Sequence, residues 1–335
     1  MHVTVLVPGY GLSSAVIGPV EVFSNTGVVW NTMLGEAVNA PFEVITASLD
    51  GKPVQFEGGI TITPDKAIAQ VRKTDLIFIP TIGLDIDTVC ERQRNMIRFI
   101  RRQAEKGTAV AGVCSGVAML AEAGLLDGRK ATTHWAIADD FRVRYPNVDW
   151  NPELFITESD NIFCGGGVYA ALDLCLYLVE RFAGYEVARQ CGRALLIDAP
   201  RTWQGGFSVP TLKQQHHDDK INLAQKYLHE KFAEPVTIDD LAQRIGMSTR
   251  NFTRRFKQAT GEPPVSYLHK LRINYAKRLL ETDFKTIQEV CYEVGYEDIP
   301  FFRKIFKRYT GLAPKEYKLR FAGKEMYDGF SANVV

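Results

Sequence analysis

A cysteine stands where a buried strand is predicted to turn directly into a helix. Residues 111–116, reading AGVCSG, set Cys114 between small neighbours. Such neighbours permit the tight turn of a nucleophile elbow, with sulfur in place of the serine oxygen, and lift the side chain out of the sheet. The free N–H groups of the following helix would stabilise a thiolate or a bound anion. We therefore expect an accessible pocket thiol at Cys114, the alternative being a buried and inert one.

A nucleophilic thiol needs a base within hydrogen-bond reach, and His134 is the candidate. It is the only histidine of the predicted first domain besides His2, and Trp135 follows it, so the alternative is a packed structural ring. Glu21 comes soon after the first predicted strand, either at the pocket end of the sheet or on the exposed face of a short helix. We predict no catalytic residue, and a ligand site formed by Cys114, Ser115, His134, Trp135 and Glu21.

Short apolar runs alternate with amphipathic stretches over the first 200 residues. Residues 76–79, LIFI, are apolar on both faces, as a parallel strand covered by helices on both sides requires. The alternation predicts an α/β fold, a parallel sheet with helices on both faces, whose ligands bind beyond the carboxyl ends of the strands. Strands are predicted at 3–7, 42–47, 74–80, 108–113, 154–157 and 161–164, and helices at 19–23, 91–106, 115–123, 136–144 and 169–182.

Residues 110–135, VAGVCSGVAMLAEAGLLDGRKATTHW, resemble the ThiJ/PfpI-like branch of the class I glutamine amidotransferase fold, most closely the version found in GlxA-type transcription regulators. Residues 165–167, GGG, followed by AALDL at 170–174, are similar to the last strand-to-helix turn of that group. The resemblance covers residues 1–199. It implies a flavodoxin-like α/β sandwich that senses a small molecule in a pocket at Cys114.

Two departures from the enzymes of this superfamily bear on activity. Isocyanide-hydrolysing and related members place an acid a few residues before a Gly-Pro pair, but the residues before Gly18-Pro19 read SAVI. Peptidase-like members follow the cysteine with histidine, whereas Ser115 follows here. The resemblance therefore implies a sensor domain that is not an enzyme. The alternative is a Cys114-dependent hydrolase or hydratase with an appended DNA-binding domain.

A supersecondary unit is repeated beyond a Pro- and Gly-rich segment, residues 200–216, which is predicted to link two domains. The pattern of residues 238–267 recurs 49 to 50 positions later. Each copy is typical of a helix-turn-helix, in which Gly246 permits a left-handed turn and Ser248 or Asp298 caps the second helix. We predict such units at 237–260 and 286–310, joined by a long helix at 266–280.

The second helix of each unit has one face that is predicted to pack in the core and an opposite face that is basic. Phe252/Phe256 and Phe302/Phe306 are i, i+4 pairs, whereas the opposite faces carry Lys, Arg and polar groups that suit phosphates and base edges. The alternative is a helical bundle with solvated basic faces, but two copies with the same turn and caps favour DNA. DNA contacts are expected from Arg250, Asn251, Thr253, Arg254, Lys257, Pro300, Phe301, Arg303, Lys304 and Lys307.

Two stretches of this half resemble the AraC/XylS-type DNA-binding domain. They are residues 260–280, TGEPPVSYLHKLRINYAKRLL, and residues 293–317, EVGYEDIPFFRKIFKRYTGLAPKEY. The resemblance covers residues 217–322 and leaves 323–335 as a carboxyl-terminal tail. The base-facing positions that it implies are Arg250, Thr253 and Arg254 in the first unit and Pro300, Phe301 and Lys304 in the second. Because the second set is partly apolar, the second unit is expected mainly to position the protein.

The composition is that of a globular protein. With 335 residues, 46% hydrophobic and 24% charged, it excludes disorder and fits two or three domains. Six cysteines without a CxxC pair indicate reduced thiols, neither a disulfide framework nor a metal site, and no cofactor is predicted. Lys and Arg outnumber Asp and Glu 22 to 16 from Lys213 onward but are outnumbered 18 to 23 before it. The basic carboxyl-terminal part therefore suits a polyanion.

These features predict a transcription regulator in the cytoplasm, since neither a targeting segment nor a membrane span is visible. Its expected partners are promoter DNA, a small effector and a second copy of the chain, which would form a homodimer. RNA polymerase is a further candidate partner. The resemblance to GlxA-type regulators implies a nitrogenous metabolite as the effector. A constitutive architectural DNA-binding protein is the third alternative.

Overall fold

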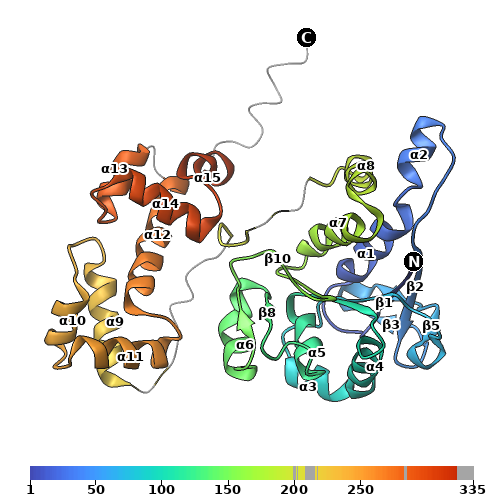
Figure 1. The fold of residues 1–335 in the computed structure, drawn as a ribbon, viewed down its shortest axis with the longest axis horizontal. Helices are drawn as coiled ribbons and strands as arrows, with labels where there is room; N and C mark the ends of the chain where they lie inside the picture. The colour runs from blue at the N-terminus through green and yellow to red at the C-terminus, as the bar shows by residue number, and fades with distance from the viewer. Residues whose placement is uncertain (199–200, 202, 208–215, 217, 283–284, 323–335) are drawn as a thin grey trace, which may run out of the picture. The chain divides into compact units, whose positions relative to one another are not determined.

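The computed structural model describes residues 1–198, 201, 203–207, 216, 218–282 and 285–322 (Figure 1). Contacts divide the chain into two compact units, Met1–Gln204 and Gly205–Val335. The predicted tail at 323–335 and most of the predicted linker, residues 200, 202 and 208–215, lie outside the described residues. No described helix is long and apolar enough to cross a membrane.

A seven-stranded, mostly parallel sheet forms the centre of the first unit. Its strands, and those of two small ribbons, are β1 His2–Leu6, β2 Glu43–Ser48, β3 Val54–Gln55, β4 Thr61–Ile62, β5 Lys66–Ala67, β6 Leu76–Ile79, β7 Ala109–Val113, β8 Lys130–Ala131, β9 Asp149–Trp150, β10 Ile156–Ser159 and β11 Ile162–Gly165. The order in the sheet is β10-β11-β7-β6-β1-β2-β5. All neighbours are parallel except β10 and β11, so the predicted parallel sheet carries one antiparallel edge strand.

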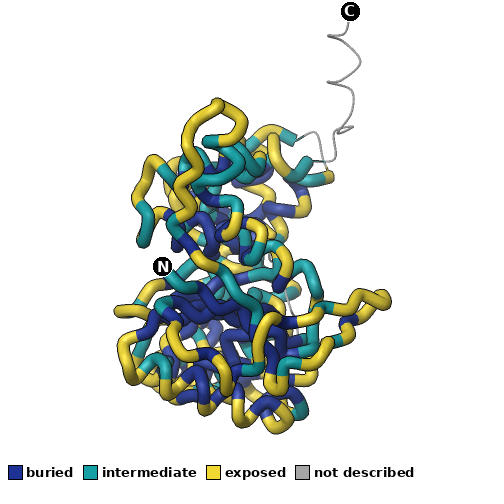
Figure 2. The backbone as a smooth tube through the Cα atoms, turned by 90° about the vertical axis from the view of Figure 1, so that its right-hand side faces the viewer, coloured by how far each residue is buried: buried dark blue, intermediate teal, exposed yellow. Residues whose placement is uncertain are grey.

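Helices cover both faces of this sheet (Figure 1). They are α1 Ser14–Asn25, α2 Val29–Leu34, α3 Ile86–Arg92, α4 Arg94–Ala104, α5 Val117–Glu122, α6 Ala138–Arg144, α7 Ala170–Ala183 and α8 Tyr185–Leu195. One core packs Ile77 and Ile79 of β6 against α3, α4 and α5. The other packs Leu76 and Phe78 against α1, α7 and α8. Successive side chains of a strand point to opposite faces, so β6 is buried on both, which confirms the predicted sandwich. Figure 2 shows buried backbone, in dark blue, gathered in the interior, with exposed segments around it.

The predicted helix at 91–106 corresponds to α4 and also takes in the last two residues of α3, a separate helix that ends just before Gln93. The Gln93 side chain is buried, and its Nε2 donates to Pro8 O, shortly after β1, at 2.8 Å. This long-range contact fixes the break, and a helical period in the sequence contains no information about it. The helices α2 and α8 were not predicted either.

The second unit contains two helix-turn-helix units in series. Its helices are α9 Asp219–Lys231, α10 Ile238–Arg244, α11 Thr249–Thr260, α12 Pro264–Thr282, α13 Ile287–Glu293, α14 Ile299–Thr310 and α15 Pro314–Phe321. The predicted caps are confirmed, since Ser248 accepts from Asn251 N and Asp298 accepts from Phe301 N. Gly246, between α10 and α11, adopts the predicted left-handed conformation with a φ of +65°.

The long helix α12 contributes to two separate cores. Leu268, near its start, belongs to the core of the first helix-turn-helix unit, and Ile273 onward belongs to the core of the second. The predicted core-facing pairs Phe252/Phe256 and Phe302/Phe306 are confirmed, because all four rings are fully buried. The joining helix of the sequence prediction is therefore also a packing element of both units.

Candidate ligand site and nucleic-acid interface

Cys114 occupies the turn at the end of β7. Its φ of +54° lies in the left-handed region, where a residue other than glycine is strained, as at a nucleophile elbow. The turn continues through a single 3-10 turn, Cys114–Gly116, into α5. Gly116 is required there, because a Cβ on it would lie 2.0 Å from Pro80 O, directly after β6. The predicted tight turn is thus confirmed, and it packs the end of β7 against the end of β6.

The thiol of Cys114 is buried, with 7% of the residue exposed. Desolvation raises the pKa of the thiol and outweighs the hydrogen bonds from Thr81 and Ser115, which act in the opposite direction. The expectation of an accessible thiol that favours the thiolate is therefore wrong. Removal from water outweighs the N–H groups of the following short helix, and the neutral thiol is the resting form at neutral pH.

Alkylation of Cys114 by iodoacetamide should accelerate about tenfold per pH unit from neutral pH upward, because only the thiolate reacts and its fraction rises tenfold per unit below the pKa. Mass spectrometry of the Cys114 peptide measures the rate. The same peptide alkylated in the unfolded chain is the control and should react faster near neutral pH. A rate that levels off near neutral pH would reveal a lowered pKa and contradict the effect of burial.

Hydroxyl groups join the strand ends around Cys114. Ser115 Oγ lies 2.8 Å from Thr81 Oγ1 and accepts from Ile82 N at 3.0 Å, so this predicted ligand residue is engaged within the fold. Thr133 Oγ1 donates to Cys114 O at 2.8 Å. Thr81 and Thr133 were not among the predicted site residues. Thr81 had a usable signal, because it directly follows a predicted strand, and neighbouring parallel strands end at the same edge of a sheet.

His134 and Trp135 directly follow Thr133. Their ring centroids are 5.2 Å apart, and both residues are half-buried. His134 Nδ1 accepts from Ala136 N at 3.1 Å, and desolvation lowers the pKa of the ring, which is therefore neutral at neutral pH. No hydrogen bond joins His134 to Cys114 within the described ranges. These contacts fit the packed structural ring better than the base.

Glu21 lies apart from the other predicted ligand residues. It is exposed on α1, whose buried face is formed by residues such as Val16, Val22 and Phe23. No side chain among the described residues forms an ion pair with Glu21. The exposed-face alternative therefore fits Glu21, and a ligand contact by it stays a prediction.

Gln204 enters the network around Cys114 from far along the chain. It lies in the segment predicted to be a linker, yet it is only 2% exposed. Its Nε2 donates to Thr133 O at 2.7 Å and to Leu154 O at 3.0 Å. Gly166, in the GGG turn after β11, makes room for it, because a Cβ there would lie 2.5 Å from Gln204 Nε2. No periodicity or motif marks Gln204 in the sequence.

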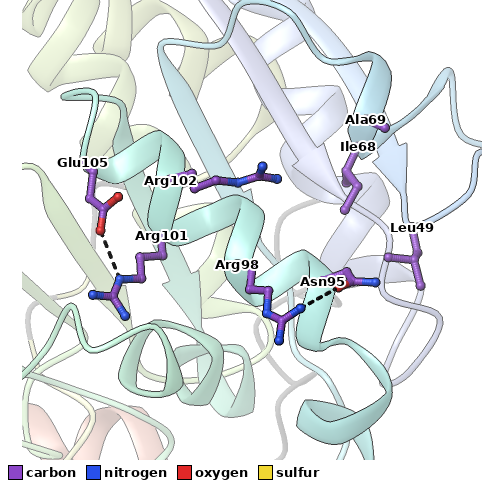
Figure 3. A pocket seen from close by; sticks show the side chains of 8 residues that line it. All are labelled: Leu49, Ile68, Ala69, Asn95, Arg98, Arg101, Arg102 and Glu105. Carbon is purple, nitrogen blue, oxygen red and sulfur yellow. Dashed lines mark hydrogen bonds and ion pairs between the residues drawn. The ribbon is translucent and has the colours of Figure 1, made fainter.

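A separate cavity of about 630 Å³ lies between α4 and the ends of β2 and β5 (Figure 3). The residues of interest in its lining are Leu49, Ile68, Arg98, Arg101, Arg102 and Glu105. Arg101 turns to Glu105, with 3.0 Å between Nε and Oε1. Arg98 and Arg102 lie one helical turn apart, and neither forms an ion pair with a described residue. Like charges at this spacing repel each other and destabilise the helix, and a bound anion would reduce that repulsion. The cavity therefore suits a ligand with an anionic group.

The predicted DNA-contacting residues lie on the solvent side of α11 and α14. All of them are exposed except Thr253, which is half-buried. Neither helix contains an acidic residue, and none of their predicted cationic contacts forms an ion pair within the described part of the chain. Arg254 Nη2 donates to Asn251 Oδ1 at 3.2 Å, which orients the guanidinium group along α11. The two helices therefore leave their positive charges available to a polyanion.

Phe301 differs from the other predicted contacts because it also packs within the fold. Its ring meets His269 and Tyr296 edge-on, with centroids 6.0 and 5.9 Å apart, and His269 Nδ1 lies 2.7 Å from Tyr296 OH. Phe301 nevertheless remains 45% exposed. An apolar surface at this position supports the expectation that the second unit reads bases by hydrogen bonds less than the first does.

Comparison with known proteins matches each half of the chain. Residues 1–181 match the DJ-1/PfpI family, and residues 241–320 match a helix-turn-helix domain. The HTH-type transcriptional regulator GbdR of Pseudomonas aeruginosa is 29% identical over 273 residues, covering 81% of this chain and 73% of that protein. The HTH-type transcriptional regulator ArgR of the same species is 32% identical over 219 residues, 65% of this chain and 66% of that one. A crystal structure of a proposed transcriptional regulator from Vibrio parahaemolyticus, 20% identical, has a similar fold over 58% of this chain and 98% of its own, with a TM-score of 0.51.

Proposed function

The chain belongs to the DJ-1/PfpI family and carries an AraC-type helix-turn-helix domain, and from this premise we propose that it regulates transcription by binding promoter DNA under the control of a small effector. The observation that carries the proposal is the pair of exposed helices α11 and α14. Each is capped, free of acidic residues and rich in Lys and Arg. Such side chains neutralise phosphates, and Arg recognises guanine edges in the major groove.

Selection of duplexes from a random pool by the full chain tests this function. We expect one enriched sequence pattern, with contacts in adjacent major grooves about one helical turn apart. Specific sites typically bind about a thousandfold or more tighter than non-specific DNA. Equal binding to selected and scrambled duplexes at low salt would contradict the proposal. Selective binding that no metabolite alters would favour the constitutive architectural protein.

Lys307→Ala should weaken binding about equally on all duplexes and lower the slope of log K against log salt by about one, because one phosphate contact releases about one counterion. Lys307 is exposed in the last turn of α14 and has no acidic neighbour on that helix. Fluorescence anisotropy over a salt series measures the slope. Lys315→Ala, on α15, is the control with the same charge change, and an unchanged slope for Lys307→Ala would argue against a phosphate contact.

Two positions for the effector have support. The first is the turn at Cys114, where the ring of Trp135 suits a nitrogenous cation. The second is the cavity at Arg98 and Arg102, which suits an anionic group. A thermal-shift screen of metabolites on the wild type, Cys114→Ala and Arg98→Gln distinguishes them. A shift lost in one variant alone assigns the position, and Arg94→Gln, on the same helix, is the matched control for the arginine.

The hydrolase or hydratase alternative has less support, because the Cys114 thiol is buried, its pKa is raised and His134 is engaged with the backbone. Turnover of a substrate by the wild type that is lost in Cys114→Ser would support the enzyme alternative.

Assembly as a homodimer is part of the proposal, because two copies would bind two half-sites with greater avidity. Sedimentation of the full chain tests that assembly.

A further inference from the structure

Residues 203–207 join the two units, and contacts hold them on both sides of one peptide bond. Gln204 is bound within the amino-terminal unit, and Gly205 within the carboxyl-terminal unit. We propose that Gln204 is a positioning residue that couples the Cys114 site to the second helix-turn-helix unit. The inference rests on the regulatory function proposed above and specifies the route by which that site acts on the DNA-binding part.

On the amino-terminal side, one residue, Thr133, connects Gln204 to the turn at Cys114 through hydrogen bonds. Gln204 Nε2 donates to Thr133 O at 2.7 Å, and Thr133 Oγ1 donates to Cys114 O at 2.8 Å. The backbone is fixed as well, since Gln204 N donates to Glu153 O at 2.8 Å. A shift of Thr133 must therefore move Gln204 or break a buried hydrogen bond, which is unfavourable because the buried amide loses a partner.

On the carboxyl-terminal side, Gly205 and Gly206 pack against the second helix-turn-helix unit. Lys277 Nζ of α12 donates to Gly205 O at 3.2 Å, and Tyr317 OH of α15 donates to Gly206 O at 3.3 Å. Both donor residues are buried. A Cβ at position 205 would lie 2.0 Å from Tyr309 O, so this backbone touches α14, the helix that carries the predicted DNA contacts of the second unit.

Gln204, with its contacts in the amino-terminal unit, and Gly205, with its contacts in the carboxyl-terminal unit, are consecutive residues. We expect a displacement of Gln204 to reach Gly205 through the peptide bond and to act there on the hydrogen bond from Lys277 and the close contact with α14. A buried ammonium group tolerates a changed hydrogen-bond environment poorly. Densely packed contacts of this kind switch between discrete arrangements instead of deforming continuously. Since the route ends on α14, the second helix-turn-helix unit is the one that responds.

A double-mutant cycle on the full chain tests the coupling by amide hydrogen exchange in the absence of DNA. Thr133→Val removes the hydroxyl that donates to Cys114, and Gln204→Ala removes the amide. With Gln204 present, Thr133→Val should change exchange in residues 305–317 about fivefold or more, as typical allosteric couplings do. With Gln204→Ala, the change should fall below about twofold, because independent sites then contribute additively.

Two controls separate coupling from damage to the fold. Amides of residues 131–136 should respond to Thr133→Val in both backgrounds. Gln190→Ala, a change of another glutamine in the same unit, should leave the response at 305–317 intact. If Thr133→Val unfolds the amino-terminal unit, Gly166→Ala replaces it, because its Cβ would meet the Gln204 amide directly.

A response at 305–317 that is equal with and without Gln204, or absent in both, would overturn the inference. Exchange is measured without DNA, so this result stands apart from the proposed DNA binding. On a duplex selected by the wild type, Thr133→Val should also change Kd about fivefold, and Gln204→Ala should abolish that change. Failure to select any duplex would contradict the proposed function and leave the exchange result to decide the coupling.

Discussion

Phe302→Ala is expected to destabilise the second helix-turn-helix unit strongly and to weaken sequence-specific DNA binding. The ring is fully buried and packs against Tyr296 and Phe306, with centroid distances of 5.6 and 5.7 Å. Truncating a buried phenylalanine costs about 3–5 kcal/mol, because the lost transfer free energy adds to that of the cavity left behind. This is a large part of the roughly 5–15 kcal/mol by which whole domains are stable.

The distribution of tryptophan allows the two units to be followed separately. Trp30, Trp135, Trp150 and Trp203 all lie in the amino-terminal unit. In urea, Phe302→Ala should lose part of its helical circular dichroism at a lower concentration, while the tryptophan fluorescence transition stays in place. Phe301→Ala, the neighbouring and half-exposed ring, is the matched control and should cost much less. Equal losses for both variants, or a common shift of both signals, would refute a separate core around Phe302.

Arg254→Ala should weaken binding to the selected duplex about 5- to 150-fold, which corresponds to roughly 1–3 kcal/mol, and relax the preference at one base pair. Arg254 is exposed on α11, and its hydrogen bond to Asn251 Oδ1 preorders the guanidinium group. Preordering matters because a bidentate contact to guanine depends on the orientation of the planar group.

Arg278→Ala is the matched control for Arg254→Ala. Arg278 is exposed on α12, outside the two predicted reading helices, and its loss removes the same charge. Anisotropy titrations of both variants on the selected duplex and on single-base variants give the comparison. If Arg254→Ala weakens binding equally on every duplex, the residue contacts phosphate and not a base.

The helix-turn-helix units could be predicted closely because their determinants are local. Ser248 and Asp298 cap helices that begin one residue later, and Phe252 and Phe256 follow the helical period. The repeat supplies a second, independent reading of the same pattern. A basic face opposite a phenylalanine pair therefore located the exposed basic helices α11 and α14 without any knowledge of tertiary contacts.

The ligand site could be predicted only in part because its properties depend on distant residues. The sharp turn at Cys114 follows from its small neighbours, but the burial of the thiol depends on the whole sheet edge. Thr133 is 19 residues from Cys114, and Gln204, which binds Thr133, is a further 71 residues along the chain. A Pro- and Gly-rich composition indicates a loop and cannot tell whether the loop is anchored.

The sharing of α12 by two cores has a consequence for how the DNA-binding half can change. Leu268 and Ile273 sit on one continuous helix but stabilise different neighbours. Excising either half would expose an apolar stripe of that helix to water, so neither half is an autonomous module. The two units share one helix, so a substitution that disrupts the helical backbone of α12 would remove support from both cores.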